Sequence, residues 1–323
     1  MSNWLFLRGE WDERTQKSID DNDDMWINLV CELTKDENDS VDIIFKGDTQ
    51  KIILDNEGNK GSKPMVFSFP DISSRKTIGM AGKYDYVFAR GGFDYYSPML
   101  RDCKDAYKIR YGAGCRFMPE PDIDYQLILV DTEHQILDVL SHYPKANVHL
   151  LIKPAAAHFK PIECEKEYDV CYIANHQQAR IKGVKWVYDT VPRGLKVLHL
   201  GYIDDCITPP PNIARKRVDR IDMPKWISKC KIGIVPYDSI DSCPRVIPEM
   251  SACGLPVICL DTVNIGHFYK FLRTKKSSFW EEVVTMCDQT KYSPNWLTDI
   301  SEHYQQYLSL PVAAKYLKDI ING

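Results

Sequence analysis

Two acidic residues stand eight positions apart in residues 232–261. Asp241 lies in a turn-rich loop, and Glu249 lies in the opening turns of a helix that the apolar periodicity predicts over residues 245–253. The start of a helix presents free backbone N–H groups and a partial positive charge, which suits a pyrophosphate group. The stretch therefore predicts a place for a pyrophosphate with two carboxylates beside it.

The residues around these acids predict a strand, a helix and a second strand. Residues 232–235 and 257–260 are apolar runs of the kind found in parallel sheets that are buried on both faces. Pro248 falls in the first turn of the predicted helix, where a missing N–H is tolerated. Ligands of such sheets bind outside the carboxyl ends of the strands, and the loop that follows residue 235 lies there.

This pattern resembles the sugar-nucleotide site of retaining glycosyltransferases with the GT-B fold. Their two acids with seven residues between them correspond to Asp241-x7-Glu249, and their Ala-x-Gly-x-Pro-Val-Ile stretch corresponds to the end of residues 250–258. The resemblance implies that Asp241 bonds hydroxyls of the donor sugar. It also implies that Glu249 accepts from the ribose hydroxyls, since one carboxylate can accept from two of them. Ser242 and Cys243 would offer backbone N–H groups to the sugar or the phosphates.

The sequence departs from the family at its first acid, which is Asp here and Glu in the signature. The alternative to a ribose-binding role is that Glu249 caps a helix or is solvated there. In that case the segment is an ordinary Rossmann-like unit.

The resemblance places basic groups for the diphosphate before the helix predicted over residues 184–190. The family has Gly-Arg, a spacer and Lys-Gly at this place, and Lys182-Gly183 matches the second pair while Gly-Arg is absent. Lys182 is therefore predicted to hold the donor phosphates, with Arg180 or Arg245 supplying the charge of the missing arginine. The alternative is that Arg180 and Lys182 are solvated loop residues.

Predicted strands and helices alternate along the chain, which indicates an α/β protein with doubly wound sheets. The resemblance implies two Rossmann-like domains that face a cleft. We expect an acceptor domain over 1–158, a nucleotide-sugar domain over 159–300, and a helix in 301–323 that packs back on the first domain. Gly9 follows the first predicted strand and would permit close backbone approach to the ligand.

The resemblance implies a His or an Asp for the acceptor side after a strand of the first domain, and the nearest candidates follow the strand expected over 126–130. Asp131 and His134 are the candidate catalytic residues there, and Arg116 is an alternative residue for the acceptor side. His134 is also a candidate for an ordinary surface residue at a helix start. The acid pair favours retention, which does not require a general base.

Composition excludes several other classes. The chain has 323 residues, 44% of them hydrophobic and 27% charged, and a net charge of −4, which suits a soluble enzyme of two domains. No apolar run is long enough for a membrane span, and the first residues do not form a signal peptide. Eleven cysteines without a C-x-x-C pair predict reduced, buried thiols in a cytoplasmic protein, without disulfide partners. The resemblance implies transfer without a metal, and the Asp-x-Asp patterns at 21–23 and 122–124 are interpreted as solvated loop acids.

The resemblance implies a glycosyltransferase that moves a hexose or pentose from a UDP-, GDP- or ADP-sugar to an acceptor hydroxyl, without a cofactor. The acceptor would be a glycan, a lipid-linked sugar or a small molecule. One alternative is a hydroxymethylated DNA base, for which the basic run over residues 214–220 could serve if it is not simply an exposed helix or loop. The other alternative is a non-catalytic nucleotide-sugar-binding protein of the same fold.

Overall fold

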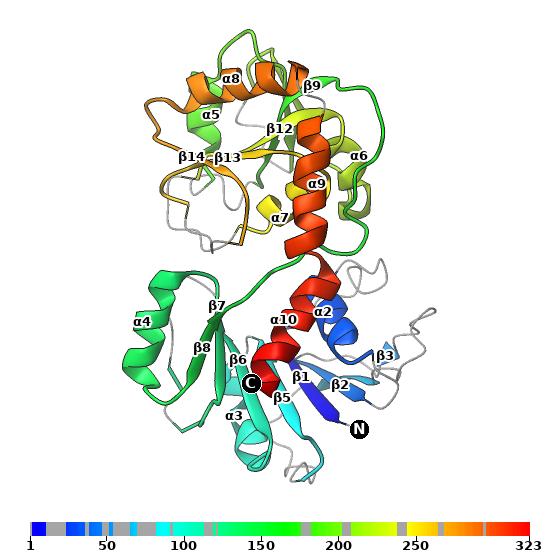
Figure 1. The fold of residues 1–323 in the computed structure, drawn as a ribbon, viewed down its shortest axis with the longest axis vertical. Coiled ribbons are helices and arrows are strands. Elements are labelled where there is room, and N and C mark those ends of the chain that lie inside the picture. The colour runs from blue at the N-terminus through cyan, green and yellow to red at the C-terminus, as the bar shows by residue number, and fades with distance from the viewer. Residues whose placement is uncertain are drawn as a thin grey trace. The chain divides into compact units, whose positions relative to one another are not determined.

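The structure of the chain is a computed structural model (Figure 1). It describes residues 2–10, 24–35, 39–46, 52–53, 65–69, 82–90, 93–112, 119–120, 122–175, 182–201, 208–237, 244–263, 268–292 and 295–323. Contacts between Cα atoms divide the chain into two units, one of residues 1–152 with 313–323 and one of residues 153–312. The domain limits predicted at residues 158 and 300 stay a prediction.

The first unit contains a sheet with the strand order β3-β4-β2-β1-β5-β6-β7-β8. Neighbouring strands are parallel except β3 and β4, which are antiparallel. The strands are β1 (Asn3–Glu10), β2 (Ser40–Lys46), β3 (Ile52–Ile53), β4 (Met65–Phe69), β5 (Tyr86–Arg90), β6 (Tyr107–Gly112), β7 (Leu127–Val130) and β8 (Asn147–Leu150). The helices are α2 (Met25–Leu33), α3 (Phe93–Asp102), α4 (Glu133–His142) and the end of α10 (Leu310–Asn322).

Burial on both faces explains the apolar strands of this sheet. The four residues from Trp4 to Leu7 in β1 are at most 5% exposed, and all four residues of β7 are fully buried. Asp24 fixes the start of α2 because its carboxylate accepts from the backbone N–H groups of Trp26 at 2.9 Å and Ile27 at 3.1 Å. The strand order reverses between β1 and β5, which makes their carboxyl ends the switch point of this unit.

The second unit contains a sheet with the order β11-β10-β9-β12-β13-β14, and all neighbouring strands are parallel. Its strands are β9 (Tyr168–Ile173), β10 (Val197–Leu200), β11 (Ile213–Lys216), β12 (Cys230–Val235), β13 (Val257–Leu260) and β14 (Leu272–Thr274). Its helices are α5 (Val184–Thr190), η2 (Arg220–Asp222), α6 (Met223–Ile227), α7 (Val246–Ala252), α8 (Phe279–Tyr292) and α9 (Asn295–Tyr307). The order reverses between β9 and β12, so their carboxyl ends form the switch point.

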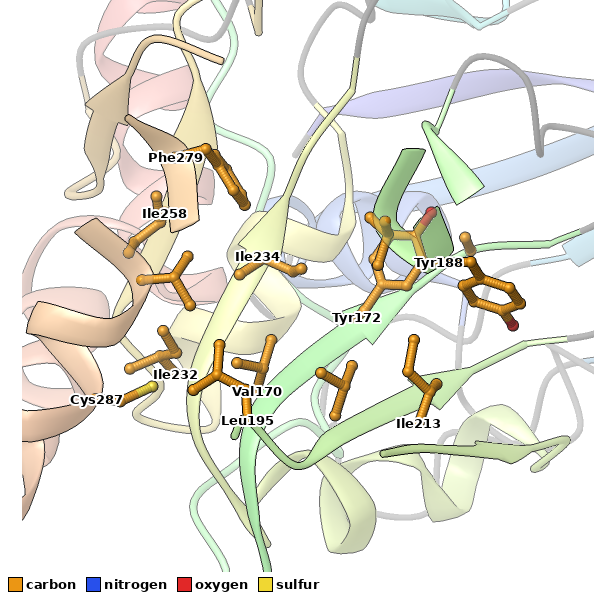
Figure 2. Close-up of a cluster of buried hydrophobic side chains, with 14 of the residues drawn as sticks. Val170, Tyr172, Tyr188, Leu195, Ile213, Ile232, Ile234, Ile258, Phe279 and Cys287 are labelled. Carbon is orange, nitrogen blue, oxygen red and sulfur yellow. The ribbon is translucent and has the colours of Figure 1, made fainter. Parts of the chain in front are cut away.

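Helices cover both faces of the second sheet. On one face, Figure 2 shows side chains of the strands, among them Ile232 and Ile234, packed with residues of α5 and α8 such as Tyr188 and Phe279. The intervening residue of β12, Gly233, faces α7, because a Cβ at this position would lie 2.3 Å from the Sδ atom of Met250. This alternation along β12 separates the two helical layers.

The basic run over residues 214–220 was interpreted as an exposed helix or loop, and this is wrong for residues 214–216. Residues 213–216 form β11, the edge strand that pairs with β10. Of its residues only Ile213 is buried, so the apolar pattern that would reveal a strand is missing and backbone pairing decides its conformation. None of the helices in the described part of the chain combines the length and apolar character that a membrane crossing requires.

Candidate functional site

The carboxyl edge of β9 and β12 is shaped by two glycines. Gly183 has φ +72°, and a Cβ there would lie 2.6 Å from the carbonyl oxygen of Pro236, which directly follows β12. Gly201 has φ +143°, and a Cβ there would lie 1.8 Å from the carbonyl oxygen of Ala174, which directly follows β9. Only residues without a Cβ fit these positions, so the chain segments after β9, β10 and β12 are brought together at the switch point.

Glu249 lies at this edge in the opening turns of α7. Its side chain is 4% exposed, and its carboxylate Oε1 accepts a hydrogen bond of 2.8 Å from Nη2 of Arg220. Its backbone N–H donates to the carbonyl oxygen of Arg245 at 3.2 Å, within the first turn of the helix. Glu249 is thus a buried acid paired with a guanidinium group and not a solvated residue on a helix surface.

Arg220 was not among the predicted site residues. Its guanidinium carbon lies 5.4 Å from the ring centre of Phe159, and its carbonyl oxygen lies 3.2 Å from Nε2 of His158. A carbonyl oxygen only accepts, so Nε2 of His158 carries the proton of that bond. In the sequence, Arg220 stands out only as part of the basic run over residues 214–220. That position does not indicate that it pairs with Glu249.

Lys182 lies at the same edge, immediately before the segment that begins α5. Its side chain is half-buried, and its Nζ atom lies 5.0 Å from the ring centre of Tyr237. Tyr237 follows β12 and is fully buried, and its hydroxyl donates to the carbonyl oxygen of Ile173, the last residue of β9, at 3.2 Å. The hydroxyl of Tyr172 donates to the carbonyl oxygen of Lys182 at 2.8 Å. These contacts hold the Lys182 ammonium beside the switch point.

His199 in β10 forms a hydrogen bond with Ala174, the residue that follows β9. It is fully buried, with Nε2 at 3.1 Å from the carbonyl oxygen of Ala174 and Nδ1 at 2.7 Å from the hydroxyl of Tyr188. Nε2 must donate to the carbonyl, so Nδ1 accepts from Tyr188. Burial lowers the pKa of His199 to about 4, the hydrogen bond to Ala174 opposes this shift, and the charge of Arg215 adds to it. His199 is therefore a neutral, structural residue at pH 7.

Of the other residues predicted for this edge, Arg245 is exposed at the start of α7. Arg180, Asp241, Ser242 and Cys243 lie outside the described residues. Their roles at the site stay predictions.

The prediction that Gly9 follows the first strand is wrong, because β1 continues to Glu10 and its register against β2 shifts between the residues on either side of Gly9. The neighbouring Arg8 donates from Nη2 to Oδ2 of Asp24 at 2.7 Å. Burial raises the pKa of Asp24, but the charge and hydrogen bond of Arg8, the backbone N–H of Ile27 and the charge of Arg90 together lower it below its usual value. This ion pair at the switch point of the first unit was not predicted from the sequence.

Asp131 and His134 also lie in the first unit. Asp131 is 2% exposed, and its two carboxylate oxygens lie 2.9 and 2.8 Å from the hydroxyl of Tyr111, which donates to them. Gln135 fixes the same turn, because its Oε1 accepts from the backbone N–H of Asp131 at 2.9 Å. His134 is exposed in the first turn of α4. The catalytic role of these two residues stays a prediction.

A cavity of about 460 Å³ in the second unit lies away from this edge. Its walls include Pro256 and Val257 at the start of β13, together with residues of α8 and α9. The start of a parallel strand is at the opposite edge of the sheet from the switch point, so the cavity is not part of the site described above. Among the residues that the structure describes, no group of three or more His, Cys, Asp and Glu side chains could hold a metal ion.

No protein-family model matches the sequence, and no curated protein matches it. Solved structures do match. Sucrose-phosphate synthase from Thermosynechococcus elongatus is 10% identical, with a TM-score of 0.66 over 100% of this chain and 98% of that one. Anabaena HepE in complex with UDP is 9% identical, with a TM-score of 0.67 over 99% of both chains. T4 phage BGT in complex with UDP-glucose is 10% identical, with a TM-score of 0.62 over 99% of this chain and 100% of that one.

These similarities confirm the predicted fold. The chain has two Rossmann-like α/β units, and its structural neighbours are GT-B glycosyltransferases. The sequence identity to these structures is 9–10%, so the similarity shows the fold of this chain. Its activity must be argued from the site.

Proposed function

We propose that this chain transfers a sugar from a nucleoside-diphosphate sugar to the hydroxyl of an acceptor. The observation that carries the proposal is the buried carboxylate of Glu249 at the switch point of the second unit. A sheet of this order binds ligands at that point, and the fold is one in which HepE and BGT were solved with UDP and UDP-glucose.

The residues of this edge have complementary roles in the proposed reaction. Glu249 accepts hydrogen bonds from the ribose hydroxyls, and Lys182 binds the diphosphate and neutralises its charge as it departs. Asp241 bonds hydroxyls of the transferred hexose or pentose. The backbone N–H groups of Ser242 and Cys243 bind the sugar or the phosphates, and Arg180 or Arg245 adds positive charge.

We further propose that transfer proceeds with retention and without a metal ion. In this proposal basic side chains and helix N-termini neutralise the leaving diphosphate, as in the sequence family that Asp241-x7-Glu249 resembles. Gly9, Asp131 and His134 belong to the acceptor side. A DNA-base acceptor stays an alternative that no contact among the described residues favours.

A thermal-shift panel of UDP, GDP, ADP and TDP tests the proposal. A ligand at about 100 times its Kd adds roughly 2.7 kcal/mol to the free energy of unfolding. We expect one diphosphate, with UDP tried first, to stabilise the wild type, and to stabilise Glu249→Gln much less. Glu281→Gln serves as the control, because Glu281 is an exposed acid in the first turn of α8.

The outcomes separate the proposed functions. Stabilisation by none of the four diphosphates contradicts the proposal. Stabilisation of the wild type without hydrolysis of the corresponding UDP-, GDP-, ADP- or TDP-sugar, and without transfer to any acceptor, favours the non-catalytic binding protein over the enzyme.

A further inference from the structure

The geometry points to Arg220 as a positioning residue that fixes the carboxylate of Glu249 for recognition of the ribose. This inference rests on the proposed function, because it assigns the orientation of an acid that binds the nucleotide. Arg220 bonds Oε1 of Glu249 at 2.8 Å. Among the described residues, no donor to the other oxygen, Oε2, is found. Oε2 therefore remains for the hydroxyls of a ligand.

Burial makes the ion pair necessary for the acid. The side chain of Glu249 is 4% exposed, whereas that of Arg220 is 31% exposed. A carboxylate taken out of water without a partner is strongly destabilised, because nothing replaces the hydrogen bonds of water. The guanidinium supplies a charge-assisted bond to one oxygen and so restricts the carboxylate to one orientation.

Arg220 is itself held from two sides. The aromatic face of Phe159 lies against its guanidinium, and His158 donates to its carbonyl oxygen. The rings of His158 and Phe159 pack with their centres 4.4 Å apart. A continuous set of contacts thus runs from residues 158–159 through Arg220 to Glu249. Such an anchored, planar group orients a carboxylate, which a flexible lysine ammonium does less well.

The pair also suits a site that receives a diphosphate. An unpaired carboxylate would repel the negative phosphates of the ligand, and the charge of Arg220 offsets that repulsion. Positioning by Arg220 therefore predicts a preference for ribose over deoxyribose, because the oriented Oε2 gains its bond from a ribose hydroxyl. Loss of Arg220 should reduce this preference.

The test compares binding of UDP and 2′-deoxy-UDP by titration calorimetry, or the corresponding pair for whichever diphosphate stabilises the wild type. A hydrogen bond to a charged group corresponds to a roughly tenfold to hundredfold preference. We expect the wild type to prefer UDP by about that factor. We expect Arg220→Gln to lose about tenfold in affinity for UDP and less than about threefold for 2′-deoxy-UDP.

Two further variants complete the experiment. Arg220→Lys keeps the positive charge without the planar fork, so we expect an intermediate preference. If thermal melting shows that Arg220→Gln is not folded, the Arg220→Lys variant alone tests whether Arg220 positions Glu249. Lys225→Gln removes an exposed positive charge five residues further along, in α6, and should bind both ligands as the wild type does.

An equal loss of affinity for the two ligands in Arg220→Gln would show a merely structural role and overturn the inference. So would a wild type that binds both ligands equally, or an Arg220→Lys variant with the full preference of the wild type. Failure of the wild type to bind any nucleoside diphosphate would instead remove the proposed function, on which the inference depends.

Discussion

Two buried polar side chains of the second unit, Glu249 and His199, are paired, and both lie at the carboxyl edge of the sheet. Glu249 is held by Arg220, and His199 is held by Tyr188 and the carbonyl oxygen of Ala174. An unpaired polar group in such a place would cost about 1–3 kcal/mol. The pairs therefore stabilise the fold and position the site with the same contacts.

Lys182→Met tests the role of the ammonium beside Tyr237. Methionine keeps the unbranched apolar stem of the side chain and removes the ammonium group, so the free energy of unfolding should change by less than about 1 kcal/mol. The affinity for UDP should fall by about tenfold to hundredfold, as expected for one lost charge-assisted bond to phosphate. Calorimetry measures the affinity and urea unfolding measures the stability.

Lys185→Met is the matched control for this prediction. Lys185 is also in the α5 region, its side chain is 84% exposed, and its ion pair with Asp189 is solvated. The affinity of the Lys185→Met variant for UDP should equal that of the wild type. A similar loss of affinity in both variants would mean that general charge, and not the position of Lys182, attracts the ligand.

The pKa of His199 predicts a loss of stability in acid. Burial lowers this pKa to about 4, against about 6.5 in the unfolded chain. As the pH falls below about 6.5, the unfolded state takes up a proton that the folded state does not. The free energy of unfolding should therefore drop by about 2 kcal/mol between pH 7 and pH 5, and by about 3 kcal/mol once the pH is below 4.

Urea unfolding at pH 7 and at pH 5 measures this contribution. In His199→Gln, which lacks the titrating ring, the drop between the two pH values should be about 2 kcal/mol smaller than in the wild type. If the drop is the same in both proteins, His199 is not the group responsible.

At the scale of elements, two positions that exclude a Cβ atom shape the carboxyl edge of the second sheet. Gly183 precedes α5 and touches the carbonyl oxygen of Pro236, while Gly201 touches that of Ala174. Because both glycines lie at the carboxyl edge of the sheet, they determine how closely the segments that bear Lys182 and Tyr237 approach. Packing of the elements thus defines the shape of the site.

Gly183→Ala should disturb this arrangement. The left-handed φ of +72° costs a residue with a Cβ about 1–2 kcal/mol, and the contact at 2.6 Å with a backbone oxygen adds to that cost. We expect the free energy of unfolding to fall by more than about 2 kcal/mol and UDP binding to weaken, because Lys182 is the preceding residue.

Two glycines serve as controls for that substitution. Gly82 has a similar φ of +71° but no atom within 4 Å of its Cβ position, so Gly82→Ala should show the cost of the backbone conformation alone. Gly194 has neither a left-handed φ nor a near atom, so Gly194→Ala should change stability by less than about 1 kcal/mol. Equal effects of Gly183→Ala and Gly82→Ala would show that the contact with Pro236 is unimportant.

At the scale of the whole molecule, the end of the chain belongs to the unit that contains its beginning. Residues 313–323 of α10 are part of the first unit, although residues 153–312 before them form the second. Three residues of this helix are buried, namely Ala313, Ala314 and Leu317. The C-terminal segment therefore contributes to the stability of the first unit.

Leu317→Ala tests this contribution. Leu317 is fully buried, and truncation of a buried leucine costs about 2–5 kcal/mol. Hydrogen exchange should show faster exchange in β1 and β5 of the first unit and unchanged exchange in β9 and β12 of the second. Lys315→Ala, in the same helix and 79% exposed at its side chain, should leave both units unaffected. Faster exchange in the second unit alone would contradict the assignment of α10.

The sequence predicted the local elements well where apolar pattern and chain breakers agree. The predicted bounds over residues 184–190 and 257–260 are those of α5 and β13. For β12 the prediction began two residues late, because the polar Lys231 interrupts the apolar run. The doubly wound fold class followed from the alternation of predicted strands and helices. Glu249 in α7 was identified by its spacing from Asp241 and by the resemblance to the family.

Tertiary structure decided the contacts between distant residues. Glu249 and Arg220 are 29 positions apart, and their pairing depends on how the segment after β11 packs beside α7. The edge strand β11 has little apolar pattern, so its conformation comes from its hydrogen bonds with β10. Local sequence determines which residues favour a strand or a helix start, because those preferences act within a few residues. The partner of a buried charge is determined only when the sheet is assembled, because burial and distance are properties of the packed molecule.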